Sequence, residues 1–479
     1  MLKNARNKIL LIRPKDNMPV FWFPLGFAYL KSDIPKRYQV KIFDCAFLDL
    51  PASSSRFQKE VMEFAPDIVG ISISTLVLKE ALEVLKKVKT INQKTITVVG
   101  GPHPSLYPDE LMKNDFIDYL FRGDAEIAFP KFLNALECGD GFNLIKGLTY
   151  RSNDTIVKND FDWETNLDQP NFPDYQAAGL EEYLKNGYNY GGFYGRTAPI
   201  WITRGCPYLC QYCSAPLING RQVRAPSVLY VVRMIKHLYD QFRIRQFTIV
   251  DDNFTFYPDY TKEFCREIIK CKKENYFSEK ISFATPNGIR LERIDDELLV
   301  LMKKAGWEGV TIAPESGSRK TLDRMKKMIN PDKVPDIVAR IKRCGLRVRA
   351  FFIVGYPGET KEDLEATVRL IRKCKLDALI VHLFHPIPGT PIFDELVKEK
   401  IIPHDFVPCS FCKAYLPRIF KKTIEQQYVA PGFENFSLFW FMLKENLLLA
   451  LRNPYSLIYF VKINGIMNII KKLSRLAVE

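Results

Sequence analysis

The segment TRGCPYLCQYC, which spans Thr203–Cys213, gathers three cysteines, Cys206, Cys210 and Cys213, within eight residues. Cysteine thiolates are the usual ligands of iron–sulfur clusters. A structural zinc site needs four ligands, and no fourth ligand lies in this segment. The spacing, with the aromatic Tyr212 directly before the last cysteine, therefore predicts a 4Fe–4S cluster that is held through three irons and has its fourth iron open.

Strand and helix patterns alternate from this segment to about residue 400. The expected strands are Ile200–Arg204, Phe247–Asp251, Ile281–Thr285, Val310–Ala313, Val348–Val354 and Leu379–Leu383. The expected helices are Val228–Asp240, Tyr260–Lys272, Asp296–Lys304, Pro331–Cys344 and Glu362–Lys373. Parallel strands joined by crossover helices can curl into a barrel whose active face lies at the carboxyl ends of the strands. We expect residues 198–400 to form a partial (β/α) barrel of six units, with the cysteine loop after its first strand.

The N-terminal third shows the same alternation, and we expect residues 1–140 to form a doubly wound, Rossmann-like α/β domain. Its expected strands are Lys8–Ile12, Gln39–Phe43, Ile68–Ile73, Ile96–Val99 and Ile117–Phe121. Its expected helices are Phe57–Phe64, Leu78–Lys89 and Ala125–Leu136. The middle strands are apolar throughout, which is typical of a parallel sheet covered on both faces.

Ligands of such sheets bind at the carboxyl ends of the strands. The residues expected there are mostly glycines and hydroxyl side chains, with one histidine and one acid: Ser72, Ser74, Thr75, Gly100, Gly101, His103 and Glu126. Glycine allows the backbone to approach a ligand closely, and the hydroxyls offer hydrogen bonds to its polar edges. These residues alone predict a ligand-binding α/β domain.

Two segments lack the alternation. Residues 141–197 are predicted to be a linker, with a small hairpin that turns at Asn153–Asp154, and residues 401–479 a helical region. Cys409 and Cys412 are either a plain thiol pair or half of a second metal site, which would need about two more ligands. The last helices mix apolar and basic residues, so they either pack on the barrel or rest on a membrane as a peripheral element.

The net charge of +14 indicates a basic surface, but no Lys/Arg block of the kind found in nucleic-acid-binding tails is present. We therefore expect no nucleic-acid partner. The chain shows no signal-peptide pattern at its start, and its 11 cysteines suit a reducing compartment, which favours a cytoplasmic location.

The barrel segment resembles the radical S-adenosylmethionine (SAM) superfamily. "IVDDNFT" (residues 249–255), "APESGS" (313–318) and "FFIVGYPGET" (351–360) resemble the segments with which the superfamily binds SAM. The resemblance implies that Asp251, Asp252 or Asn253 meets the SAM amino group. It places Glu315 and Ser316 at the ribose and Gly355 at the adenine, beside Gly358 and Glu359. Arg290 is the implied partner of the SAM carboxylate, and Tyr212 adjoins the site.

The N-terminal segment resembles the cobalamin-binding domain that precedes many radical SAM barrels. The similar stretches are "PLGFAYLKSDIP" (24–35), "VGISIST" (69–75), "VVGGPHPSLYPDEL" (98–111) and "FRGDAE" (121–126). The chain lacks the Asp-x-His-x-x-Gly motif that supplies an axial histidine in cobalamin-dependent mutases. The resemblance therefore implies a cobalt without a histidine ligand. His103 would hydrogen-bond near a cofactor edge, and direct ligation is the alternative.

The resemblance to the cobalamin-dependent branch implies methylation of an unactivated carbon on a small-molecule or lipid-like substrate. A 5′-deoxyadenosyl radical would remove a hydrogen atom, and methylcobalamin would deliver the methyl group. An electron donor such as flavodoxin or ferredoxin would reduce the cluster. Two alternatives stay open, which are ring-forming or oxidative chemistry without methyl transfer and a non-catalytic cobalamin or redox sensor.

Overall fold

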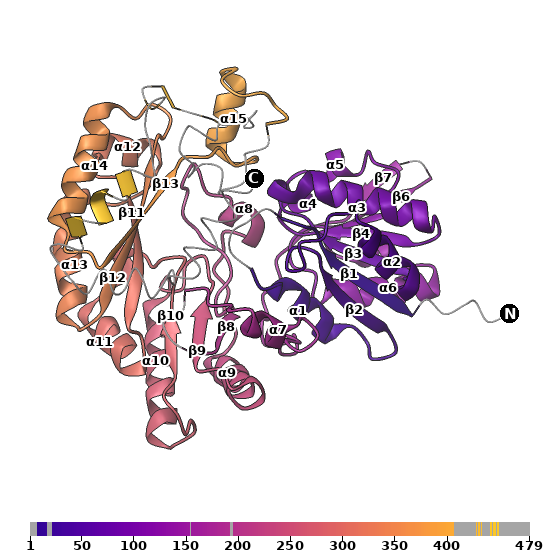
Figure 1. Cartoon of the computed structure of the whole chain (residues 1–479), viewed down its shortest axis with the longest axis horizontal. Helices are drawn as coiled ribbons and strands as arrows, with labels where there is room; N and C mark the ends of the chain where they lie inside the picture. The colour runs from indigo at the N-terminus through magenta and orange to yellow at the C-terminus, as the bar shows by residue number, and fades with distance from the viewer. Residues whose placement is uncertain are drawn as a thin grey trace. The chain divides into compact units, whose positions relative to one another are not determined.

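The computed structural model of the chain describes residues 7–16, 22–153, 155–191, 195–406 and some positions between 428 and 449 (Figure 1). The chain divides into two compact units. One comprises Met1–Asn186 with Ala215–Arg221, and the other comprises Gly187–Ser214 with Gln222–Glu479. No helix within the described residues is long and apolar enough to cross a membrane. The region that holds Cys409, Cys412 and most of the C-terminal helical pattern lies outside the described residues.

The N-terminal unit is built on a seven-stranded sheet with the order β2-β1-β3-β4-β5-β6-β7. The strands are β1 (Lys8–Arg13), β2 (Gln39–Asp44), β3 (Ile68–Ser72), β4 (Ile96–Gly100), β5 (Tyr119–Phe121), β6 (Leu148–Ser152) and β7 (Thr155–Lys158). The first five are parallel, and β6 and β7 are antiparallel to their neighbours. The helices are α1 (Leu25–Asp33), α2 (Ser55–Phe64), α3 (Leu78–Ile91), α4 (Pro102–Leu106), α5 (Pro108–Leu111), α6 (Ala128–Cys138), α7 (Leu180–Lys185) and α8 (Ala215–Asn219), with 3-10 turns η1 (Thr75–Val77) and η2 (Phe142–Leu144).

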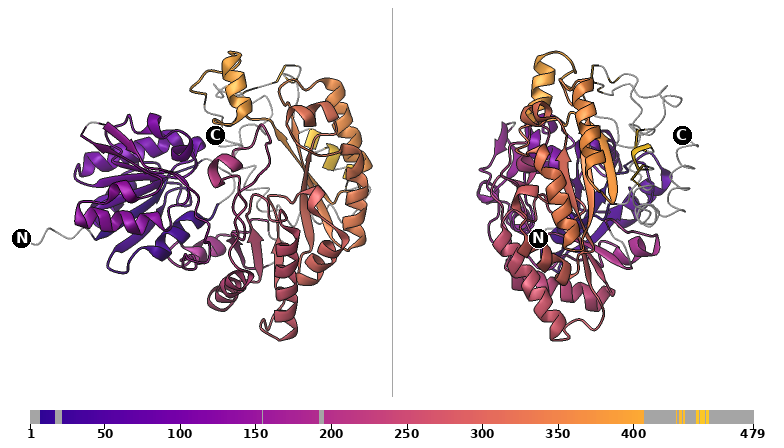
Figure 2. Two further views of the ribbon diagram at one scale, coloured as in Figure 1. Left: turned by 180° about the vertical axis from the view of Figure 1, so that it is seen from behind. Right: turned by 90° about the vertical axis from the view of Figure 1, so that its left-hand side faces the viewer.

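Helices cover both faces of this sheet (Figure 2), and a separate apolar cluster fills the space on each face. Leu10 and Ile12 of β1 pack with residues of α2 and α3, whereas Ile9 and Leu11 pack with residues of α1 and α6. Successive side chains of a strand point to opposite faces, so this continuous apolar run is buried on both sides. The predicted doubly wound domain is confirmed.

The hairpin predicted at Asn153 forms, and it extends the sheet of the N-terminal unit. Strand β6 pairs with β5, with Tyr150 opposite Tyr119, and β7 pairs with β6. The sequence places a domain boundary near residue 140, whereas this compact unit continues to Asn186. The physical reason is that the hairpin covers an edge that β5 would otherwise leave unpaired.

The second unit contains two three-stranded parallel sheets, β10-β9-β8 and β11-β12-β13. The strands are β8 (Thr197–Ile200), β9 (Gln246–Ile249), β10 (Ser282–Ala284), β11 (Gly309–Glu315), β12 (Arg347–Val354) and β13 (Ala378–Leu383). Parallel bridges from Phe283 to Trp307 and from Ile289 to Ile312 join the two sheets. The predicted partial barrel of six strands is therefore confirmed (Figure 1).

Helices follow the barrel strands: α9 (Val228–Phe242), α10 (Pro258–Lys273), α11 (Asp296–Ala305), α12 (Arg319–Arg324), α13 (Val334–Arg343), α14 (Lys361–Lys373) and α15 (Pro391–Lys398), with 3-10 turns η3 (Leu291–Arg293) and η4 (Pro331–Lys333). Polar N-caps fix several starts, because their side chains accept a backbone N–H of the first turn. Ser227 caps α9, Asp295 caps α11, and Thr360 forms a capping box with Asp363 in α14.

The first barrel strand lies before the predicted one. The sequence predicts Ile200–Arg204, whereas β8 is Thr197–Ile200, so the two share only Ile200. The backbone N–H groups of Ile202 and Thr203 donate to the Asp251 carboxylate at 2.9 and 2.7 Å instead of joining a strand ladder. A buried side chain therefore ends the strand and begins the cysteine loop.

We expect Gly101→Ala to destabilise the chain by about 1–3 kcal/mol, the range for a residue held in a disfavoured backbone conformation. Gly101 has φ +100°, and a Cβ there would lie 2.8 Å from Ser72 Oγ. Gly26→Ala is the matched control, because a Cβ on this α1 residue meets nothing within 4 Å and alanine favours helix. Denaturant unfolding midpoints measure both changes, and equal midpoints for the two variants would contradict the explanation.

Candidate functional site

The three cysteines of the loop after β8 are all half-buried, and none of them forms a disulfide. A turn closes the end of the loop, where Cys213 N–H donates to the Cys210 carbonyl at 3.2 Å. No three His, Cys, Asp or Glu side chains of the described residues converge on a single metal ion. A 4Fe–4S cluster does not require such convergence, since each thiolate binds a different iron. The all-thiol donor set of this loop therefore fits an iron–sulfur cluster.

One side of the loop is anchored through Tyr212. Its hydroxyl donates to Glu315 Oε1 at 2.9 Å, and the Lys327 ammonium lies 2.9 Å from the same oxygen. Lys327 and Glu315 have side chains only 8% and 9% exposed. Burial, the largest single influence, lowers the pKa of Lys327, but the charge of Glu315, the nearby Cys210 and the hydrogen bond to Glu315 together raise it, so the net pKa is raised. The backbone adds a hydrogen bond of 3.0 Å from Gln211 N–H to the Met325 carbonyl.

The other side of the loop is anchored through Tyr208. The Arg290 guanidinium stacks 3.7 Å from the centre of this ring. Arg293 Nε lies 3.3 Å from the Tyr208 hydroxyl, and Arg290 Nε lies 3.1 Å from Glu292. Arg290 is thus beside the loop, as a SAM-carboxylate partner must be, and its guanidinium already contacts two side chains.

The three polar residues that follow β9 divide into different environments. Asp251 accepts hydrogen bonds from Ile202 and Thr203, and burial raises its pKa to about 7 despite these donors. Asn253 Nδ2 lies 3.9 Å from Cys206 Sγ, and its Oδ1 is buried without a partner in the described part of the chain. Burial also raises the pKa of Cys206, the Tyr208 amide opposes the rise, and the Asp252 carboxylate adds to it. Asn253 and Asp252 therefore adjoin the cysteine loop, whereas Asp251 supports its backbone.

The ends of β11 and β12 meet the same loop. Glu315 has φ +67°, an uncommon backbone conformation that turns the chain after β11. The Tyr356 ring packs edge-on against Tyr212, with centroids 6.3 Å apart. The preceding Gly355, at φ +75°, donates its N–H to Glu359 Oε2 at 2.5 Å, and burial raises the pKa of Glu359 to about 7. Ser316 instead points into the packing of α14, where its hydroxyl meets Thr367 at 3.0 Å.

Several functional candidates carry no signal in the sequence. Lys327 lies 12 positions after Glu315, beyond α12, and no periodicity relates the two residues. In the sequence, nothing distinguishes Tyr208 and Tyr356 from other aromatic residues. Only their contacts in the folded chain show that they support the loop. Only the aromatic position directly before a cysteine, Tyr212, could be selected from spacing alone.

The predicted residues of the N-terminal unit lie at the carboxyl edge of β3, β4 and β5. His103 is 4% exposed, and its Nδ1 lies 3.1 Å from the Thr75 hydroxyl. Burial lowers the pKa of His103 to about 4, so the ring is neutral. Its Nε2 is buried and has no partner among the described residues. An unsatisfied buried nitrogen at the ligand-binding edge of a doubly wound sheet fits a polar group on a bound cofactor.

Of the two glycines at this edge, only Gly101 has a structural explanation. A Cβ on Gly101 would meet Ser72 Oγ and the backbone of Ile73, so the space that this glycine leaves is filled by the protein. A Cβ on Gly100 would make ordinary contacts only. Ser74 is half-buried and Glu126 is buried at the same edge.

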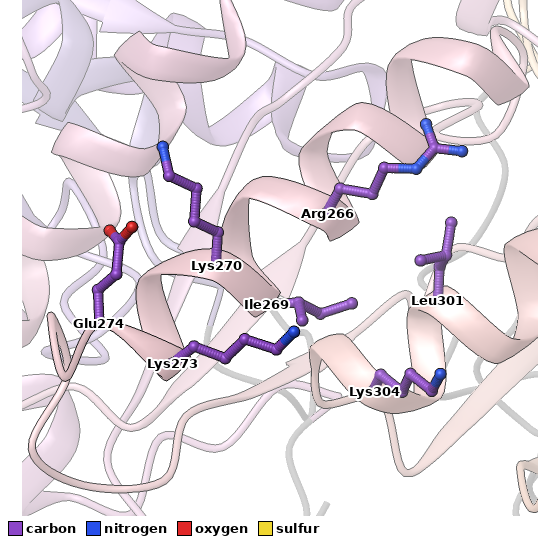
Figure 3. A pocket seen from close by; sticks show the side chains of 7 residues that line it. All are labelled: Arg266, Ile269, Lys270, Lys273, Glu274, Leu301 and Lys304. Atoms are coloured by element: carbon purple, nitrogen blue, oxygen red, sulfur yellow. The ribbon is translucent and has the colours of Figure 1, made fainter.

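A shallow surface depression lies on α10 and α11 (Figure 3). It is lined by Arg266, Ile269, Lys270, Lys273, Glu274, Leu301 and Lys304. None of these residues belongs to the candidate site, so the depression has no part in it.

Lys327→Met should lower the free energy of unfolding by about 3–5 kcal/mol, since it leaves the Glu315 charge buried without its partner. Lys327→Met combined with Glu315→Gln should lose less, because no buried charge then remains. The difference in unfolding free energy between the wild type and Lys327→Met is full at neutral pH. It declines as pH rises through the folded-state pKa of Lys327, which is raised. Denaturant unfolding measures these effects. The exposed neighbour Lys326→Met is the control, and an equal loss in both single variants would refute the role of the ion pair.

Comparisons with known proteins agree with this arrangement. Residues 200–371 match the Radical SAM superfamily, and residues 16–133 match the B12 binding domain. An uncharacterized methyltransferase of Pyrococcus horikoshii is 30% identical over 405 residues, which cover 82% of this chain and 84% of that protein. Cytidylyl-2-hydroxyethylphosphonate methyltransferase of Streptomyces wedmorensis is 26% identical over 451 residues and covers 82% of each chain. Anaerobic magnesium-protoporphyrin IX monomethyl ester cyclase of Rubrivivax gelatinosus is 28% identical over 409 residues, covering 82% of this chain and 69% of that protein.

Among solved structures, the fold is similar to that of the radical SAM methyltransferase TsrM from Kitasatospora setae with tryptophan and a SAM analogue bound. The TM-score is 0.70 at 18% identity, covering 92% of this chain and 89% of that one. The predicted cofactors, a 4Fe–4S cluster, SAM and cobalamin, are those of the two matched families, and the prediction of an enzyme is confirmed. A relative with 30% identity over most of both chains, together with these two domains, shows that the chain belongs to the radical SAM enzymes that carry a cobalamin-binding domain.

Proposed function

We propose that this enzyme methylates an unactivated carbon of a small-molecule substrate. The observation that carries the proposal is the three-cysteine loop. Tyrosines on its two sides anchor the loop to the barrel, and Asn253 and Glu315 lie next to it. When bound, the cofactors supply a 5′-deoxyadenosyl radical that removes a hydrogen atom and a methyl group that replaces it. Two similar proteins, from Pyrococcus horikoshii and Streptomyces wedmorensis, are named methyltransferases.

The chain's own residues have separable tasks in this proposal. Cys206, Cys210 and Cys213 hold the cluster, and anchoring their loop before any cofactor binds keeps the open iron in one place. The buried Asn253 Oδ1 accepts a hydrogen bond from the SAM amino group, since no described residue uses this oxygen. Glu315, which is paired with Lys327, accepts from the ribose hydroxyls.

The remaining predicted residues have supporting tasks. Gly355 and Tyr356 shape the adenine side, where their N–H groups hold Glu359. Asp252 and Arg290 complete the SAM site beside Cys206. Asp251 and Ser316 keep the loop backbone and α14 in position. In the N-terminal unit, His103 hydrogen-bonds to an edge of cobalamin. The Thr75 hydroxyl holds the imidazole ring of His103 in place.

Ring-forming chemistry is the second candidate, because the relative from Rubrivivax gelatinosus is named a cyclase. Both reactions begin with removal of a hydrogen atom, so the same cluster loop serves either. A flavodoxin or ferredoxin is the expected reductant of the cluster. Membrane contact through the last helices concerns residues outside the described ranges and stays a prediction.

Replacing any one loop cysteine by alanine should abolish formation of 5′-deoxyadenosine from SAM, because three thiolates hold the cluster and leave one iron open. Cys206→Ala, Cys210→Ala and Cys213→Ala are each measured for this product and for bound iron. Cys344→Ala, at the end of α13, is the control and should keep both. Normal product from any loop variant would exclude the assignment.

The protein should bind cobalamin without a protein nitrogen on cobalt, because the chain has no Asp-x-His-x-x-Gly motif. The Thr75 hydroxyl and the Ile73 carbonyl already hold the side chain and backbone of His103. Electron paramagnetic resonance of the Co(II) form should show no nitrogen splitting from the protein. His103→Phe is the comparison, and a nitrogen splitting that this variant removes would prove direct ligation.

A further inference from the structure

Arg349 is a buried cation inside the barrel unit that no predicted cofactor contact uses. It is the third residue of β12, and it is 9% exposed. Its Nε and Nη2 both donate to one oxygen, the Thr311 hydroxyl of β11, at 3.0 Å each. Two donors of a charged group therefore share one neutral acceptor.

No carboxylate among the described residues lies within ion-pair distance of Arg349. Two nearby carboxylates, one directly before β13 and one at the end of β11, are engaged elsewhere. Asp377 pairs with Lys342 at 3.0 Å and accepts the Val348 N–H, and Glu315 pairs with Lys327. Charged side chains are rarely this buried without a counter-charge. The guanidinium of Arg349 therefore has no counter-charge among the residues that the structure describes.

The side chain points to the interior of the barrel. Val348 and Ala350, its neighbours along β12, are fully buried on the opposite face, where α13 packs. Burial raises the pKa of Tyr190 to about 12, and the nearby charge of Arg349 opposes this rise. The Tyr190 carbonyl accepts a hydrogen bond from Thr248 of β9 at 2.7 Å. Residues from β9, β11 and β12 thus surround one interior space. The printed hydrogen bonds of Arg349 use Nε and Nη2, so among the described residues Nη1 is left as a donor for a ligand atom.

We propose that Arg349, oriented by Thr311, binds an anionic group of the substrate, a carboxylate or a phosphate-type oxyanion, inside the barrel. A guanidinium suits this task because its planar fork matches the oxygens of such groups. This inference rests on the proposed function and names its substrate class.

The register of the strands gives the depth of the proposed anion position. Glu315 pairs with Phe352, which lies three residues beyond Arg349 along β12. Three residues of a strand span about 10 Å, so Arg349 lies roughly this distance from the level of Glu315, toward the N-terminal end of β12.

Thermal unfolding of the reconstituted full-length enzyme tests the inference with methylphosphonate, inorganic phosphate and acetate as separate probes. For the wild type we expect the unfolding temperature to rise with the concentration of at least one probe, because an anion that binds only the folded state stabilises it. The probe that acts distinguishes a phosphate-type group from a carboxylate. Without any probe, Arg349→Met should unfold at the same or a higher temperature, because it removes an uncompensated buried charge, and it should show no probe response.

Arg343→Met, an exposed change at the end of α13, is the matched control and should keep the wild-type response. Three results would overturn the inference: no response in the wild type, a response that persists in Arg349→Met, or a clear loss of stability in Arg349→Met without probe. The last result would mark Arg349 as a structural residue. None of these readouts requires SAM cleavage or methyl transfer, so failure here is separate from failure of the proposed function.

Discussion

The contact between Tyr212, Glu315 and Lys327 joins the cysteine loop to the fourth strand of the barrel. A buried carboxylate and a buried ammonium lie 2.9 Å apart, and the tyrosine hydroxyl donates to the same oxygen. Such a group is stable only as a whole, because removing one charge leaves the other buried in a medium that solvates it poorly. The position of the cysteines therefore depends on residues more than a hundred positions later in the chain.

The opposite side of the loop is held by a different kind of contact. Arg290 stacks on Tyr208, and the Asp251 carboxylate accepts hydrogen bonds from the backbone N–H groups at the start of the loop. Interactions of three strand ends thus hold one eleven-residue segment, Thr203–Cys213, from several directions. A loop without regular structure gains rigidity in this way, and a cluster with one open iron needs that rigidity to keep its substrate-facing side constant.

Two of the buried cations in the barrel unit, Lys327 and Arg349, differ in their partners. Lys327 has a carboxylate partner, whereas the only partner of Arg349 in the described part of the chain is the hydroxyl of Thr311. The first arrangement suits a permanent support, and the second leaves a charge available to a ligand. The N-terminal unit shows a related contrast, because His103 is neutral, held through Nδ1, and unsatisfied at Nε2. Unsatisfied polar groups therefore occur in both units at places where a bound molecule would supply the missing partner.

The sequence by itself determined the cysteine spacing, the alternation of strands and helices, and the two α/β domains, because each of these is a local pattern. Tertiary structure decided the partners of Tyr208 and Tyr212, the supporting task of Asp251, and the addition of the β6–β7 hairpin to the first sheet. Helix α1 was not predicted from the sequence. Its apolar residues are not confined to one face, so they show no helical period. Local patterns follow from backbone geometry within a few residues, whereas contacts such as Tyr212 with Glu315 join positions 103 apart, and only the folded chain brings these together.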